Sequence, residues 1–256
     1  MVKILAANIL RGRKCIFCGS YGLYRLADRR VKCRKCKRVY SLRKVKQDIN
    51  VLHYFALELS ANRTASELGL SYNTVRNRYM FFREKIAEYS EETFRKLSGE
   101  LEIDETYFGG KRKGKRGRGA HNKVVVFGIL ERNGKVYTTV VPDVSAPTLM
   151  AEIEAKTEKG SVFYTDCFKS YKSLKQYGKH NKINKQFAYA KGHNHVNGLE
   201  GFWSFAKERF HKYHGINKQN YALYLKEMEF RFNNRNSDIF KEMFNIIYDK
   251  IGTNFN

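Results

Sequence analysis

The spacing of the cysteines constrains the fold of this chain more than any other feature. Four of its five cysteines form two pairs, each with two intervening residues: Cys15 with Cys18, and Cys33 with Cys36. Four thiolates spaced in this way can hold a zinc ion in a tetrahedron, and a site with all four positions filled serves structure rather than catalysis. Two disulfides are the alternative, which a reducing cytoplasm disfavours. The pattern predicts a zinc ribbon over residues 1–48.

Positive charge is concentrated in two segments. Of the chain's net +24, residues 1–48 carry +13 and residues 109–123 carry +7. Concentrated basic charge favours a polyanion such as DNA, because binding releases condensed counterions. A solubility surface or an anionic membrane would also tolerate it, but no basic amphipathic helix is apparent. We therefore expect double-stranded DNA as the partner. The basic residues of the second segment are expected to contact its backbone: Lys111, Arg112, Lys113, Lys115, Arg116 and Arg118.

The rest of the composition is that of a folded, water-soluble protein. Hydrophobic residues make up 42% of the chain, yet no apolar run reaches the roughly 18 residues that a membrane span needs. The first residues have no small-residue cleavage site of the kind that follows a signal peptide. We therefore expect a cytoplasmic protein with no membrane partner.

A helical module is predicted for residues 49–95. Apolar residues follow helical spacing from residue 51, a short helix ends at Gly69, and Ser71 is a typical first cap for the next helix. This is the layout of a helix-turn-helix, whose last helix enters a DNA groove. An ordinary helical connector is the alternative. The residues that we expect to contact DNA from the start of that helix are Asn73, Thr74, Arg76 and Arg78.

Residues 96–256 change to a mixed pattern of strands and helices. Strands are predicted over residues 101–108, 124–130, 135–141 and 161–165, with a hairpin at Asn133-Gly134 between the second and third. Helices are predicted over residues 146–156, 195–213 and 218–232, with a short helical stretch near residues 170–177 and a basic strand near Phe187. The fold class is therefore α/β, with a mixed sheet flanked by helices.

Three acidic residues occupy informative places in this domain. Asp104 lies within a strand, where an inward carboxylate is costly unless it binds a partner. Asp166 ends an apolar strand, and Glu200 lies on the long helix. Carboxylates that converge from two strands and a helix suit hard divalent cations, and two such cations can support phosphoryl transfer. Any one of these acids taken alone could instead form a surface salt bridge.

Several phrases in order resemble bacterial insertion-sequence transposases of the DDE superfamily. They are residues 103–110 (IDETYFGG), 164–166 (YTD), 195–204 (HVNGLEGFWS) and 227–235 (EMEFRFNNR). The closest resemblance is to the group that places a zinc ribbon and a helix-turn-helix before a ribonuclease H-like core. It implies a metal-dependent nuclease and strand transferase that cleaves transposon ends, using Mg²⁺ or Mn²⁺, and that works on DNA as a homo-oligomer.

The resemblance assigns Asp104 and Asp166 as metal ligands but leaves the third position open. Relatives differ on whether an asparagine or an acid serves there, and this chain offers both Asn197 and Glu200, three residues apart on one helix face. We favour Glu200, because a carboxylate is the stronger ligand for magnesium. Lys207, two turns further along, is expected to contact a phosphate, whereas Trp203 could pack in the core or stack on a base.

Two other functions use the same sequence features. A DNA-binding regulator could have evolved from a transposase whose core no longer cuts, and a zinc-ribbon nuclease could cut without joining strands. The intact set of Asp104, Asp166 and Glu200 argues against the first alternative. The second shares the site and is not distinguished from a transposase by the sequence.

Overall fold

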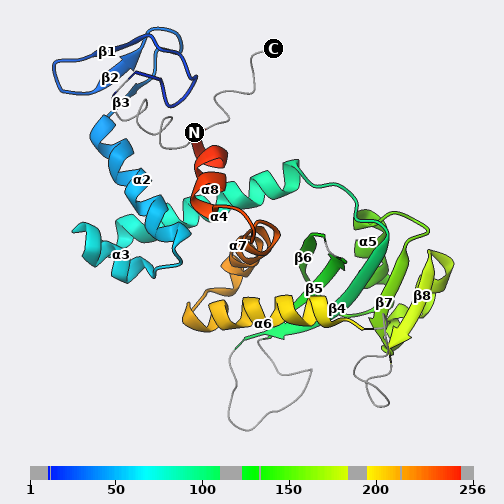
Figure 1. Cartoon of the computed structure of the whole chain (residues 1–256). Coiled ribbons are helices and arrows are strands. Elements are labelled where there is room, and N and C mark those ends of the chain that lie inside the picture. The colour runs from blue at the N-terminus through cyan, green and yellow to red at the C-terminus, as the bar shows by residue number, and fades with distance from the viewer. Residues whose placement is uncertain are drawn as a thin grey trace. The chain divides into compact units, whose positions relative to one another are not determined.

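The computed structural model describes residue 11 and residues 13–109, 123–132, 134–183, 195–213 and 215–248. The described residues form two compact units (Figure 1). One contains the residues up to Tyr89 together with those from Asn234 onward, and the other contains Ser90–Asn233. The basic residues between Lys111 and Arg118 lie outside the described residues, as does Phe187.

The cysteine-rich segment of the first unit contains a small antiparallel sheet. Its strands are β1 (Leu23–Arg25), β2 (Val31–Cys33) and β3 (Val39–Tyr40), in the order β1-β2-β3. Val31, Cys33 and Tyr40 are buried, which is a very small apolar core for an independent fold. A bound metal would supply the stability that so small a core cannot.

Helix α2 (Leu42–Ala56) begins earlier than the sequence predicted. Ser41 accepts a hydrogen bond from the backbone nitrogen of Lys44 and so caps the first turn, and Val45 and Ile49 are buried one helical turn apart. The alternation of polar and apolar residues over 37–42 also suits a strand, but only Val39 and Tyr40 adopt one. Because α2 runs through residue 48, the predicted boundary between ribbon and helical module falls inside a helix.

The next two helices have the predicted helix-turn-helix order. Helix α3 (Ala61–Leu68) ends at Gly69, which adopts a left-handed conformation with φ of 60°. Helix α4 (Tyr72–Glu92) follows, and the Ser71 hydroxyl accepts a hydrogen bond from the backbone nitrogen of Thr74 at 3.1 Å. Buried Phe55, Tyr79 and Phe82 pack α2 against α4 through edge-to-face and tilted ring contacts.

A last helix, α8 (Ile239–Tyr248), packs against α2 and was not predicted from the sequence. The rings of His53 and Phe240 lie 5.6 Å apart, and the hydroxyl of Tyr248 donates to Asp48 at 3.2 Å. Asp48 also forms an ion pair with Arg78 of α4. The C-terminal helix thus belongs to the helical unit, whereas the sequence-based division placed it with residues 96–256.

The second unit is built on a five-stranded mixed sheet. Its strands are β4 (Glu100–Phe108), β5 (Val124–Glu131), β6 (Val136–Val141), β7 (Val162–Asp166) and β8 (Lys179–Ile183). The order is β6-β5-β4-β7-β8. Strand β5 is antiparallel to both β4 and β6, whereas β7 is parallel to both β4 and β8. Strands β5 and β6 pair as the predicted hairpin, and the arrangement is the predicted ribonuclease H-like fold.

Helices cover the sheet on two sides. Helix α5 (Ala146–Lys156) and the 3₁₀ segment η1 (Lys169–Gln176) share a core with Leu101, Ile103 and Phe163. Helix α6 (Asn197–Lys212) and helix α7 (Tyr221–Asn233), which follows the short 3₁₀ segment η2 (Lys218–Asn220), form the other core (Figure 1). In the described part of the chain, no helix combines the length and apolar character that crossing a bilayer would require.

Side chains of α7 satisfy the backbone of the edge strand β6. Asn233 accepts a hydrogen bond from the nitrogen of Val136 at 2.8 Å and donates to its carbonyl at 2.9 Å. Buried Glu229 accepts from both the nitrogen and the hydroxyl of Thr138 at 2.8 Å. An edge strand otherwise presents unpaired groups that can recruit another chain. Glu229 and Asn233 both belong to the EMEFRFNNR phrase, and these contacts give them a structural role.

The edge contact predicts a measurable loss of stability. Replacing Asn233 with alanine leaves the nitrogen and carbonyl of Val136 without this partner, so we expect the free energy of unfolding to fall by about 1–3 kcal/mol. Urea unfolding followed by circular dichroism measures the change. Gln219→Ala, at an exposed position in η2, is the matched control and is expected to change it by less than about 0.5 kcal/mol. Equal stability of the two variants would contradict the role of Asn233.

Candidate active site and zinc site

Asp104 and Asp166 lie on the two central strands of the sheet. Strands β4 and β7 are parallel, with Glu102 paired to Tyr164. Two residues further along both strands, the same register sets Asp104 level with Asp166. Because side chains alternate along a strand, both carboxylates point to the face of the sheet that carries α6. Both carboxylates are half-buried. The nitrogen of Phe168 donates to Asp166 at 2.9 Å, which fixes that carboxylate at the end of its strand.

Helix α6 meets Asp104 through a tryptophan. The indole nitrogen of Trp203 donates to the Asp104 carboxylate at 3.1 Å. Gly128, the partner of Asp104 on β5, leaves the space for the ring, since a Cβ there would lie 2.6 Å from a Trp203 ring atom. Trp203 is buried in the core between α6 and the sheet. Its position supports core packing and leaves no exposed ring face for base stacking.

The third candidate acid lies one turn before Trp203 on the same helix. Glu200 is half-buried in the first turn of α6, and Asn197 is exposed at the first residue of the helix. Lys207 is exposed one turn after Trp203. Protein atoms around its ammonium lower the pKa of Lys207, and the charge of Asp104 acts in the opposite direction. Lys207, Trp203 and Glu200 therefore follow one side of α6, with Asp104 facing its middle.

The three acids do not form a single compact cluster. A metal site would need three or more His, Cys, Asp or Glu ligand atoms close together. Within the described residues, only the four paired cysteines have their ligand atoms all within 4.8 Å of one another. The oxygens of Asp104, Asp166 and Glu200 are thus spread more widely than around one ion. Two ions in a phosphoryl-transfer site lie about 3.5–4 Å apart, so ligands to different ions are also more widely separated.

Glu105 points away from this face. It is buried on the side of the sheet that carries η1, where the hydroxyl of Tyr171 donates to it at 2.8 Å. Burial raises the pKa of Tyr171 well above its usual range, and the negative charges of Glu105, Asp104 and Asp166 add to the effect. Tyr171 is thus a neutral donor that holds Glu105 inside the core, as expected for a structural acid.

The residues predicted to contact DNA from α4 have different environments. Asn73, Thr74 and Arg76 are exposed in the first turns of the helix. Arg78 is half-buried, forms an ion pair with Asp48 and lies over the ring of Phe81 at 4.3 Å. The guanidinium of Arg78 therefore links α4 to α2, a role that the sequence did not indicate.

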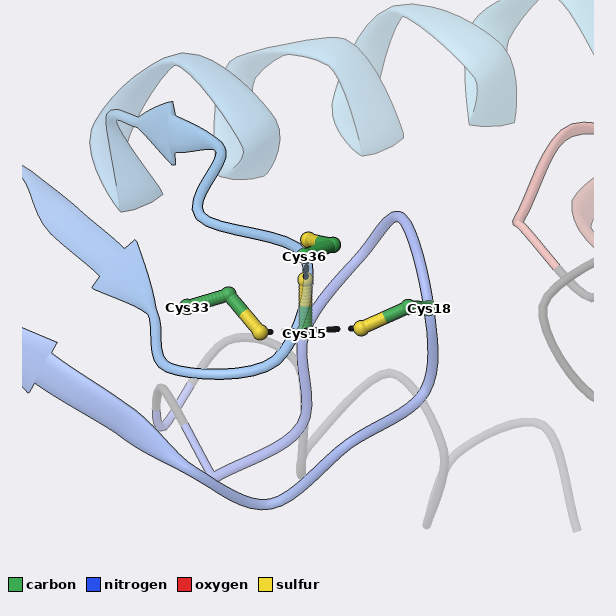
Figure 2. A group of neighbouring side chains, drawn as sticks. All are labelled: Cys15, Cys18, Cys33 and Cys36. Atoms are coloured by element: carbon green, nitrogen blue, oxygen red, sulfur yellow. Dashed lines mark hydrogen bonds between the residues drawn. The ribbon is translucent and has the colours of Figure 1, made fainter.

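The four paired cysteines converge from two segments of the ribbon, and Cys33 is the last residue of β2. Figure 2 shows their side chains pointing toward one another. The sulfurs of Cys15 and Cys36 lie 3.7 Å apart, and those of Cys18 and Cys33 lie 3.5 Å apart. Thiolates about 2.3 Å from a tetrahedral zinc ion are separated by about 3.8 Å, so these distances fit such an ion. The fifth cysteine is exposed in the other unit and is not part of the cluster.

These observations define a class of protein: an α/β domain of ribonuclease H-like topology with acidic residues on its central strands. The family model described as the ISXO2-like transposase domain matches residues 96–233. An "uncharacterized transposase-like protein" of Haemophilus influenzae is 46% identical over 101 residues, which cover 39% of this chain and 82% of that protein. The chain belongs to the DDE superfamily of insertion-sequence transposases and, within it, to the ISXO2-like family.

Solved structures with a similar arrangement include viral integrases and a transposase. The catalytic core domain of BIV integrase is 16% identical, with a TM-score of 0.35, over 50% of this chain and 80% of that chain. The Mos1 strand transfer complex is 13% identical, with a TM-score of 0.33, over 80% of this chain and 78% of that chain.

Proposed function

We propose that this transposase cleaves phosphodiester bonds at transposon ends and joins the freed 3′ hydroxyl to target DNA, with Asp104, Asp166 and Glu200 as its metal ligands. The observation that carries the proposal is the shared face of Asp104 and Asp166. The register of β4 and β7 sets the two carboxylates level, and the Trp203 contact sets the side of α6 that bears Glu200 over the same face.

The donor set fits magnesium or manganese. Three half-buried carboxylates give oxygen ligands, which hard divalent cations prefer. When bound, two such ions polarise the attacked phosphate and stabilise the attacking and leaving oxygens of an in-line displacement. The contact with Trp203 fixes the orientation of Asp104 before substrate arrives, so little reorganisation is needed. Calcium, which takes looser coordination, is expected to support DNA binding without turnover.

DNA binding is assigned to the basic segments and to the start of α4. Exposed Asn73, Thr74 and Arg76 are placed to reach a groove, while Lys207 would contact a phosphate beside the acids. The glycine-rich basic segment from Lys111 to Arg118 would follow the backbone without reading bases. The ribbon would hold a structural zinc ion through its four cysteines and present its basic residues to DNA.

The test is an assay of the full-length protein on DNA that carries the element's own ends. A transposase produces both nicked ends and strand-transfer products in Mg²⁺. A nuclease gives nicked ends alone, and a regulator binds the ends and leaves them intact. Absence of strand-transfer products, with cleavage intact, would replace the proposal with the nuclease alternative.

A further inference from the structure

We infer that Glu102 and Arg132 are positioning residues for catalysis, because together they fix the start of α6 and hence the place of Glu200 relative to Asp104. The inference rests on the proposed function of Asp104 and Glu200 as metal ligands. No sequence motif singles out either Glu102 or Arg132. Glu102 is buried, with 1% of its surface exposed, and lies two residues before Asp104 on β4.

Helix α6 lacks the side-chain cap that helices commonly have. Its cap position is Val196, whose side chain cannot accept a hydrogen bond, and the first four backbone nitrogens of a helix need outside partners. Glu102 supplies one from the neighbouring strand: its Oε2 accepts from the nitrogen of Leu199 at 2.9 Å. A carboxylate at this end of a helix is also favoured by the helix dipole.

Arg132 holds the other oxygen of the same carboxylate. Its Nε lies 3.1 Å from Oε1 of Glu102, and its terminal nitrogen donates to the backbone carbonyl of His195 at 2.6 Å. The guanidinium also lies over the ring of Tyr164, 3.7 Å from its centroid. Arg132 therefore connects β4 and β7 to the backbone two residues before α6.

The close packing at Gly198 shows how tightly the helix start is held. A Cβ at this position would lie 2.4 Å from Leu130 and 3.0 Å from Oε2 of Glu102. The glycine therefore allows the first turn of α6 to approach the Glu102 carboxylate. Glu200 is in that turn, two residues after Gly198, so a shift of the turn moves the Glu200 carboxylate directly.

The two contacts between α6 and β4 act as a pair. Glu102 fixes the first turn, and Asp104 fixes the second through Trp203 at 3.1 Å. Between them lies Glu200. Residues that orient metal ligands typically change metal affinity or activity by about 10–100-fold when they are replaced. Loss of Glu102 should therefore weaken cation binding without removing any ligand.

The chain's single tryptophan allows this to be measured without catalysis, because Trp203 contacts Asp104 directly. Paramagnetic Mn²⁺ bound at the acids is expected to quench its emission. We expect the Mn²⁺ concentration for half-maximal quenching to rise by about 10–100-fold in Glu102→Ala and less in Glu102→Gln, which keeps one acceptor oxygen. Glu100→Gln is the matched control: Glu100 also contacts Arg132, at 3.5 Å, but lies exposed at the beginning of β4.

The outcomes separate three interpretations. If Glu102 has a structural role alone, its variants would have a lower unfolding temperature but would reach half-maximal quenching at the wild-type Mn²⁺ concentration. That result would overturn the inference. If Glu102→Ala fails to fold, the isosteric Glu102→Gln distinguishes the positioning role from a purely structural one. Asp104→Ala is expected to abolish quenching. If it quenched normally, the metal site itself would be wrong, whatever the Glu102 variants showed.

Discussion

Replacing Glu200 with alanine is expected to reduce end cleavage by about 10³-fold, equivalent to about 4 kcal/mol of transition-state stabilisation. The same change at Asn197 is expected to cost less than about tenfold. The reason is their difference in position: Glu200 is half-buried on the side of α6 that meets Asp104, whereas Asn197 is exposed at the first residue of the helix. A carboxylate is also the stronger ligand for magnesium. Single-turnover cleavage in Mg²⁺ measures both rates.

The control for this comparison is Glu208→Ala. Glu208 is an exposed acid on the same helix, paired with Lys212 at 3.5 Å, so its loss removes a negative charge from α6 without touching the candidate site. We expect cleavage within about twofold of wild type. Full activity in Glu200→Ala together with an inactive Asn197→Ala would transfer the third-ligand role to Asn197.

Replacing Cys15 with serine is expected to reduce the zinc content from one ion per chain to nearly none. Cys15 is 1% exposed and its sulfur lies 3.7 Å from that of Cys36, so serine there removes one of the four ligands from a buried cluster. Zinc binding contributes about 10–16 kcal/mol in small zinc modules. We therefore expect the ribbon to unfold and end-specific DNA binding to fall at least about tenfold.

Elemental analysis of purified protein, with a DNA-binding titration, tests this directly. Cys167→Ser is the matched control, because it removes an exposed thiol outside the cluster and should keep one zinc ion and normal binding. A zinc-free wild-type protein, or a Cys15→Ser variant with an intact ribbon, would contradict a structural zinc site.

Much of the second unit was predictable because its signals are local. Strands β4, β5, β6 and β7 alternate or are mainly apolar, a turn dipeptide separates β5 from β6, and apolar residues recur at helical spacing in α5 and α6. Asp104 and Asp166 could be singled out because an acid within or at the end of a buried strand needs a reason. Their shared face could not be derived from the sequence, since it depends on the register between strands far apart in the chain.

The features that were missed depend on partners distant in sequence. Helix α8 is apolar enough to predict, but its packing on α2 joins residues about two hundred positions apart, such as Asp48 and Tyr248. Glu102 occupies an ordinary strand position, and its hydrogen bond from the nitrogen of Leu199 joins residues 97 positions apart in the sequence. Ser41 is the cap of α2, yet it lies within an alternating segment, residues 37–42, that equally suits a strand. In each case tertiary contacts decided between local alternatives.

The most direct test of the central claim is a gel assay of end cleavage and strand transfer by wild type, Asp104→Ala and Asp166→Ala in Mg²⁺. The DNA carries the element's own ends, and binding is measured in parallel. We predict that both variants bind the ends as wild type does but form neither product, because these carboxylates hold cations for chemistry while the basic segments provide affinity. Wild-type levels of product from Asp104→Ala or Asp166→Ala would contradict the proposed mechanism.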